Sequence, residues 1–197
     1  VWSKAFGMAN EDEIMGIENT FSICSISKLF TSIAIMKLVE EGKIKLEDPI
    51  NKLLPWFDLK QQFENSPPLT IKSILTHSSG LPRESNHPYW SWPDFPFPNK
   101  ENVISELKNQ EMLYPSSKYY QYSNLGLSLL GYVIEEVSGE SFDNYITENI
   151  LKPLELNSTK PFMSKEEYGG LLSVGYSSIN RNRNSCLLYT SDAADDG

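Results

Sequence analysis

The feature that most constrains this chain is an apolar segment at residues 25–41. Its apolar residues would cover almost the whole circumference of a helix, so the sequence predicts a helix that is buried on several sides. Gly42 follows two glutamates and is the expected C-terminal cap of this helix. Other elements of the fold must therefore cover most of its surface.

Further elements follow from periodicity and capping signals. The alternating residues 1–7 predict a short strand, with a turn and a returning strand in residues 8–19. Helices are also predicted at 48–54, from a Thr70 cap to about residue 76, and at 100–112, 125–137 and 141–151. The segment 84–99 is rich in proline and aromatic residues, which predicts an irregular loop that packs against the domain or lines a cleft.

Composition limits the classes of partner. The chain has 197 residues, of which 40% are hydrophobic, and this is enough for one domain-sized core. Its net charge of −9 argues against nucleic acid or an anionic membrane surface as a partner. No stretch is long and apolar enough to form a transmembrane segment. The two cysteines and two histidines predict neither a disulfide framework nor a metal site.

The first motif with chemical meaning is Ser25-Ile-Ser-Lys28, where the long helix begins. Residues three apart lie on one helix face, so the two side chains can meet. A serine hydroxyl becomes a strong nucleophile when a neighbouring base removes its proton, and a neutral lysine can do this. The N-terminus of the helix also offers backbone N–H groups to a developing oxyanion.

The Ser-x-x-Lys pattern alone is weak, because it occurs a second time at Ser105 and Lys108. That second match falls on a charged helix that faces solvent, and we interpret it as coincidence. For the first match, the alternative is a helix-capping serine followed by a lysine whose stem lies along the apolar surface.

The second motif is Tyr122-Ser-Asn124, on a loop before an apolar helix. A tyrosine next to a lysine can transfer a proton, and an asparagine carboxamide can bond both a lysine and a substrate amide. Turn and cap chemistry is the alternative interpretation, since Ser and Asn often precede helices.

Four stretches occur in the order and spacing of the β-lactamase-like serine hydrolases: residues 21–42, 46–55, 69–82 and 114–159. The chain resembles this family over most of residues 1–180. The Tyr-Ser-Asn motif is similar to that of class C β-lactamases, D-Ala-D-Ala carboxypeptidases and family VIII esterases.

The resemblance implies a role for each motif residue. Ser25 would be the acylated nucleophile, Lys28 its activator, Tyr122 the second acid/base, and Asn124 a contact to substrate and lysine. It implies no cofactor and no metal. His77, in a turn typical of the family, is interpreted as structural.

The family's third motif, Lys or His followed by Thr or Ser and Gly, occurs nowhere in the chain. Residues 186–196 look like a translated sequencing adaptor, so we interpret 1–184 as a partial domain and 185–197 as a non-native tail. The resemblance then implies a truncated α+β fold of the β-lactamase/transpeptidase type, with N-terminal strands and the helical region but without C-terminal strands. We expect an active parent protein and an inactive, aggregation-prone 197-residue chain.

Two function classes follow. The first is a serine hydrolase that forms an acyl-enzyme with a β-lactam, a D-Ala-D-Ala peptide or a small ester, so that its partner is a small-molecule or peptidoglycan-like substrate. The second is a non-catalytic or sensor-like penicillin-binding homologue. An α/β-hydrolase is disfavoured because the chain has no Gly-x-Ser-x-Gly elbow. The resemblance favours an extracytoplasmic location and leaves the oligomeric state open.

Overall fold

The computed structural model of the chain describes residues 2–86, 98–163 and 171–174. Several sequence predictions concern residues outside this part of the chain. They are the central stretch of the aromatic loop at 87–97, and the predicted tail at 185–197 with its boundary after residue 184.

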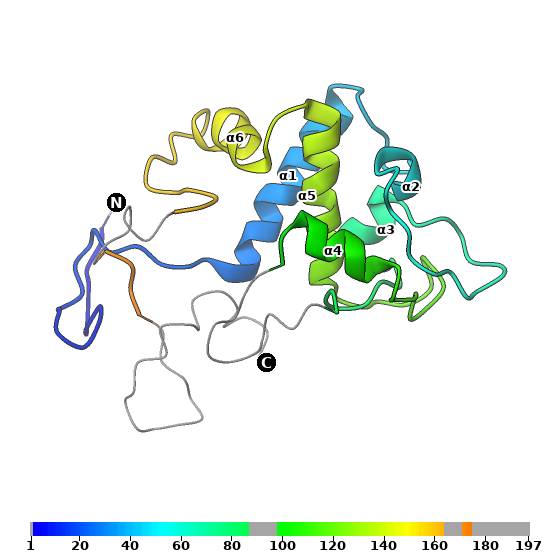
Figure 1. The fold of residues 1–197 in the computed structure, drawn as a ribbon. Coiled ribbons are helices and arrows are strands. Elements are labelled where there is room, and N and C mark those ends of the chain that lie inside the picture. The colour runs from blue at the N-terminus through cyan, green and yellow to red at the C-terminus, as the bar shows by residue number, and fades with distance from the viewer. Residues whose placement is uncertain (1, 87–97, 164–170, 175–197) are drawn as a thin grey trace.

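Two long helices lie side by side at the centre of the described fold (Figure 1). The 3-10 turn η1 (Cys24–Ile26) leads into α1 (Ser27–Glu40), and α5 (Asn124–Ser138) packs against α1. Both predicted long helices are confirmed, and Gly139 ends α5 in the left-handed conformation with φ 75°. Their fully buried members include Ala34, Ile35, Leu38, Leu129, Leu130, Val133 and Ile134.

Shorter helices complete the helical part of the fold: α2 (Ile50–Leu53), α3 (Ile71–Leu75), α4 (Lys100–Leu107), α6 (Phe142–Ile146) and the π-helical turn η2 (Thr147–Leu151). The predicted cap of α3 is confirmed, because the Thr70 hydroxyl accepts a hydrogen bond from the backbone N–H of Ser73 at 3.2 Å. The predicted helix at 141–151 forms, but it changes from α to π geometry after residue 146.

Helix α4 is shorter than the sequence predicts. The helix was expected to reach residue 112, but it ends at Leu107. The residues that follow α4 pair instead with the backbone of Lys60. The Lys60 N–H donates to the Gln110 carbonyl at 3.3 Å, and the Lys60 carbonyl accepts from the Met112 N–H at 3.1 Å. This tertiary pairing removes the backbone groups that would have continued the helix.

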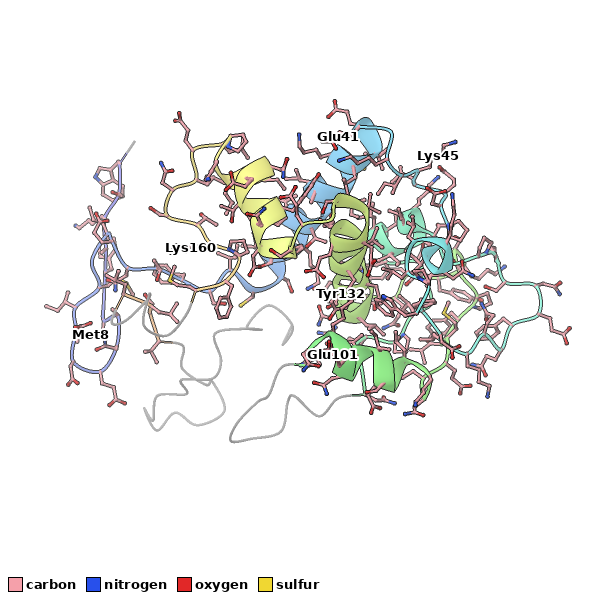
Figure 2. All side chains as sticks on the ribbon, turned by 45° about the horizontal axis from the view of Figure 1, so that its top comes forward. Met8, Glu41, Lys45, Glu101, Tyr132 and Lys160 are labelled. Atoms are coloured by element: carbon pink, nitrogen blue, oxygen red, sulfur yellow. The ribbon has the colours of Figure 1, made fainter. Side chains whose placement is uncertain are left out.

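The N-terminal strand predicted over residues 1–7 is absent from residues 2–7, which are the ones that the structure describes. An isolated antiparallel bridge joins Met8 and Ile14, so the predicted turn and return form without a ladder. Thr20 N–H donates to the Leu171 carbonyl at 2.8 Å, which ties this segment to the later chain. Met8 lies on an arm apart from the helices (Figure 2). A two-stranded pairing with no further strand beside it is only marginally stable, and this accounts for the missing ladder.

One face of α1 remains uncovered by the described residues. Ile26, Leu29, Ile33 and Met36 are exposed by 61, 58, 40 and 46% respectively. The prediction that this helix is buried on several sides is therefore wrong for this face, because the described elements pack only on the opposite one. These four side chains form an exposed apolar surface, which favours association of the chain.

Candidate active site

The first pair of candidate residues meets at the N-terminus of α1. Lys28 Nζ donates a hydrogen bond to Ser25 Oγ at 2.9 Å, and both side chains are half-buried. Ser25 sits in the 3-10 turn η1 rather than in α1 itself. The residue before it, Cys24, has φ 45°, a left-handed conformation that is strained for a residue other than glycine. The chain therefore bends sharply just before the serine.

Tyr122 completes a three-residue cluster around the serine hydroxyl. Its phenolic oxygen lies 2.8 Å from Ser25 Oγ, and either hydroxyl can be the donor. Lys28 Nζ lies 4.9 Å from the centre of the Tyr122 ring, and Arg83 Cζ lies 5.1 Å from the same centre. Two cations close to one ring stabilise its position through the negative face of the π system. The structure thus places the Lys28 amine and the Tyr122 hydroxyl each within hydrogen-bonding distance of Ser25 Oγ.

Asn124 begins α5 close to this cluster. Its Nδ2 donates to Glu84 Oε1 at 2.6 Å, a short bond of the charge-assisted kind. Since a carboxylate only accepts, this bond fixes which end of the carboxamide carries the NH₂ group. Asn124 and Lys28 both line a cavity of about 380 Å³ between α1 and α5. The contact predicted between Asn124 and Lys28 stays a prediction.

The cavity extends from the cluster along α5 toward α6. Its remaining lining residues are Ser27, Thr31, Leu127, Ser128, Gly131, Tyr132, Glu135 and Phe142. Burial, Glu135 and Glu101 raise the pKa of the Tyr132 hydroxyl, so it stays neutral. Figure 2 shows Glu101 at the start of α4 and Tyr132 on α5. The wall is mostly apolar and could receive the uncharged part of a small molecule.

The turn at residues 77–84 holds the whole Tyr122 loop in place. Backbone N–H groups donate from Gln121 to the His77 carbonyl at 2.6 Å and from Asn124 to the Arg83 carbonyl at 2.8 Å. The Ser123 hydroxyl donates to the Pro82 carbonyl at 2.6 Å. The loop and the turn are about 40 residues apart in sequence, yet they form a continuous line of contacts.

His77 and Glu84 were not among the predicted site residues. His77 was expected to be structural, and the structure places its ring against Tyr122, with centroids 4.5 Å apart and an interplanar angle of 31°. Burial and the charge of Lys28 lower the pKa of His77 below its usual value of 6.5. A signal for His77 is present in the sequence, because it lies in the turn typical of the family, whereas nothing in the sequence singles out Glu84.

The second Ser-x-x-Lys match lies on a solvent-facing helix, as the sequence predicts. Ser105 and Lys108 are exposed on and just after α4, and the Ser105 hydroxyl donates to the Asn102 carbonyl of the same helix at 2.9 Å.

Within the described ranges, no group of three or more potential ligands is placed to hold a metal ion. Likewise, none of the described helices is both long and apolar enough to cross a membrane.

Comparisons with known proteins give one consistent family for most of the chain. The beta-lactamase family model matches residues 1–163. Beta-lactamase-like protein 2 of Dictyostelium discoideum is 32% identical over 174 residues, which cover 85% of this chain and 32% of that protein. The chain thus spans about a third of the length of this curated relative.

Solved structures give the same result. The octameric penicillin-binding protein homologue from Pyrococcus abyssi has a TM-score of 0.76 and 32% identity, and the match covers 94% of this chain and 43% of that one. The beta-lactamase/D-alanine carboxypeptidase from Yersinia pestis, complexed with citrate, has a TM-score of 0.74 and 26% identity over 92% of this chain and 51% of that one. The β-lactamase-like fold expected from the sequence is thereby supported, although its predicted strands are not seen as a sheet in the described residues.

Proposed function

The chain belongs to the beta-lactamase family, and we propose that its Ser25 site is that of a serine hydrolase working through an acyl-enzyme. The observation that carries this proposal is the position of Ser25 Oγ, which lies 2.9 Å from Lys28 Nζ and 2.8 Å from Tyr122 OH. A serine hydroxyl with two proton-transfer groups at hydrogen-bond distance is arranged for nucleophilic attack. A serine that only caps a helix needs neither group.

The proposed reaction has two halves. Ser25 Oγ attacks the carbonyl carbon of the substrate while its proton passes to the amine of Lys28, which must first have given up its own extra proton. The bond to the leaving group then breaks, and Tyr122 gives the departing nitrogen or oxygen a proton that Lys28 replaces. Water next attacks the acyl ester, loses a proton to the same pair of groups, and releases the acid as Ser25 regains its own proton.

Asn124 and the adjoining cavity provide the basis for the proposed substrate class. The half-buried carboxamide of Asn124 is held by Glu84, and it lines the mostly apolar cavity, where it can bond a substrate amide or carbonyl. We propose a β-lactam, a D-Ala-D-Ala peptide or a small ester as the substrate. By family resemblance we also propose an extracytoplasmic location.

The test is covalent labelling of the purified chain with a fluorophosphonate, followed by mass spectrometry of its peptides. We expect one phosphonate on the peptide that contains Ser25, none in Ser25→Ala, and labelling about a hundredfold slower in Lys28→Ala. Ser105→Ala is the matched control, because it removes the serine of the other Ser-x-x-Lys pattern, and it should label at the wild-type rate. Labelling that survives in Ser25→Ala would contradict the proposal.

Turnover separates the two function classes. For the chain by itself we expect stoichiometric labelling without hydrolysis of a nitrophenyl ester or a chromogenic cephalosporin. The source DNA should be sequenced past the codon for Asn184, and any longer reading frame assayed with the same two substrates. Turnover by that product supports the hydrolase, whereas a single stable acylation would favour the sensor-like homologue.

A further inference from the structure

We propose that His77 is a positioning residue that holds the Tyr122 ring against Ser25, a role that rests on the proposed function of the Ser25 site. The sequence suggested only that His77 shapes a turn. In the structure it is bonded to the residues on both sides of Tyr122 and stacked on the tyrosine itself.

Three separate contacts join His77 to the tyrosine loop. Its carbonyl accepts from the Gln121 N–H at 2.6 Å, and its ring Nδ1 accepts from the Ser123 N–H at 3.3 Å. Its imidazole lies 4.5 Å from the Tyr122 ring, centre to centre, with the planes 31° apart. The residues before and after Tyr122 and the ring of Tyr122 are therefore all fixed by one side chain and its own backbone.

The contact to Ser123 requires one protonation state of His77. Because Nδ1 accepts a hydrogen bond, the ring proton of the neutral form must be on Nε2. Protonation would turn Nδ1 into a donor facing another donor, so this bond would be lost. Burial and Lys28 both lower the pKa of His77, and the neutral form is therefore the one present at pH 7.

The charged groups beside the Tyr122 ring are cations, and they favour the neutral form of His77. Lys28 lies above the same Tyr122 ring and Arg83 is 5.1 Å from its centre, so a further positive charge is unfavourable. Tyr120 approaches the imidazole edge-on with centroids 6.0 Å apart. Below the pKa of His77 the tyrosine loop should loosen, and Tyr122 should lose its position beside the Ser25 hydroxyl.

The backbone at His77 suggests a conservative replacement. Its φ of 51° lies in the left-handed region, which asparagine adopts more readily than most residues. The Oδ1 atom of asparagine branches from Cγ as Nδ1 of histidine does, and it can accept from the same N–H group. His77→Asn should therefore keep the bond to Ser123 but lose the titrating ring and the stacking area. His77→Ala should lose the bond to Ser123, the titrating ring and the stacking area.

The first experiment does not depend on activity. Long-range ¹H–¹⁵N NMR spectra of the chain contain signals from only two histidines, His77 and His87, which the single Asn variants assign. We expect the His77 tautomer with the proton on Nε2 at pH 7, and a pKa below 6.5. We also expect the Tyr122 ring signals to shift in His77→Asn and to stay unchanged in Ser105→Ala, which alters an exposed position on α4. A mixture of tautomers, or an unshifted Tyr122, would overturn the positioning role even if the serine proves unreactive.

The second experiment measures the rate of fluorophosphonate labelling at Ser25 between pH 5 and 8. We expect His77→Ala to be at least about tenfold slower than the wild type at pH 7.5, since small misplacements of a reacting group are costly. His77→Asn should recover most of that rate and lose less of it between pH 7 and 5 than the wild type does. Equal rates in all three proteins would overturn the inference, whereas no labelling in any of them would count against the proposed function alone.

Discussion

Ser123 links the tyrosine loop to the turn at 77–84 and to α5, and its replacement tests how much these bonds stabilise the fold. Its side chain is only 1% exposed and forms two hydrogen bonds. The hydroxyl donates to the Pro82 carbonyl at 2.6 Å and accepts from the Gly126 N–H at 2.9 Å, which caps α5. Ser123→Ala removes both bonds and keeps the Cβ atom in place.

The expected cost follows from these two bonds. Losing an N-cap hydroxyl costs about 1 kcal/mol. The carbonyl of half-buried Pro82 then lacks a partner, which adds about 1–2 kcal/mol. We therefore expect Ser123→Ala to lower the free energy of unfolding by about 2–3 kcal/mol.

Ser141→Ala is the matched control, because Ser141 caps α6 from an exposed position with one long bond, in which Asn144 N–H donates to its hydroxyl at 3.3 Å. It should cost about 0.5 kcal/mol. Urea unfolding followed by circular dichroism gives both values from the shift in midpoint at constant slope. If Ser123→Ala were no more destabilising than Ser141→Ala, the bond from the Ser123 hydroxyl to the Pro82 carbonyl would add nothing to stability, and this reasoning would be refuted.

Three other perturbations have defined outcomes. Gly80→Ala should lower the free energy of unfolding in urea by more than about 2 kcal/mol, because Gly80 has φ +79° and an added Cβ would lie 2.1 Å from a backbone oxygen. Gly42→Ala is the control: Gly42 has φ +71°, but an added Cβ would meet nothing within 4 Å, so the cost should be only about 1 kcal/mol. Glu84→Ala should cost about 1–2 kcal/mol by the same assay, because it removes a charge-assisted bond, and no loss would show that this bond is not formed. A Leu29→Gln/Ile33→Gln double variant should sediment as a smaller species than the wild type at equal concentration, because two exposed apolar side chains of α1 become polar. Unchanged sedimentation would exclude this face as the cause of association.

The parts of the site that the sequence could predict are the local ones. Ser25 and Lys28 are three residues apart, so helix geometry alone places them together. The capped helix at 71–75 and the end of α5 at Gly139 likewise follow from neighbouring residues. The family resemblance added Tyr122, because no local rule joins residues separated by 97 positions.

The parts that were missed depend on distant partners. Glu84 becomes important only when the chain brings it to Asn124, and nothing in its neighbours predicts that encounter. Helix α4 ends early because Lys60 captures the following backbone, and the exposed face of α1 depends on what packs beside it. Periodicity shows that a helix surface is apolar, but it does not show whether anything covers that surface.

The turn at residues 77–84 explains how a loop without regular secondary structure can hold a reactive tyrosine. Hydrogen bonds join four residues of the turn to four residues of the loop and the start of α5, so a shift of one residue would break several of them at once. Gln121 donates to His77, Ser123 to His77 and Pro82, Asn124 to Arg83 and Glu84, and Leu125 to Arg83. Cooperative contacts of this kind give a loop the precision of a helix or strand, and proton transfer over less than 3 Å needs that precision. Loss of one contact in the turn should therefore displace Tyr122 before it lowers the stability of the whole fold.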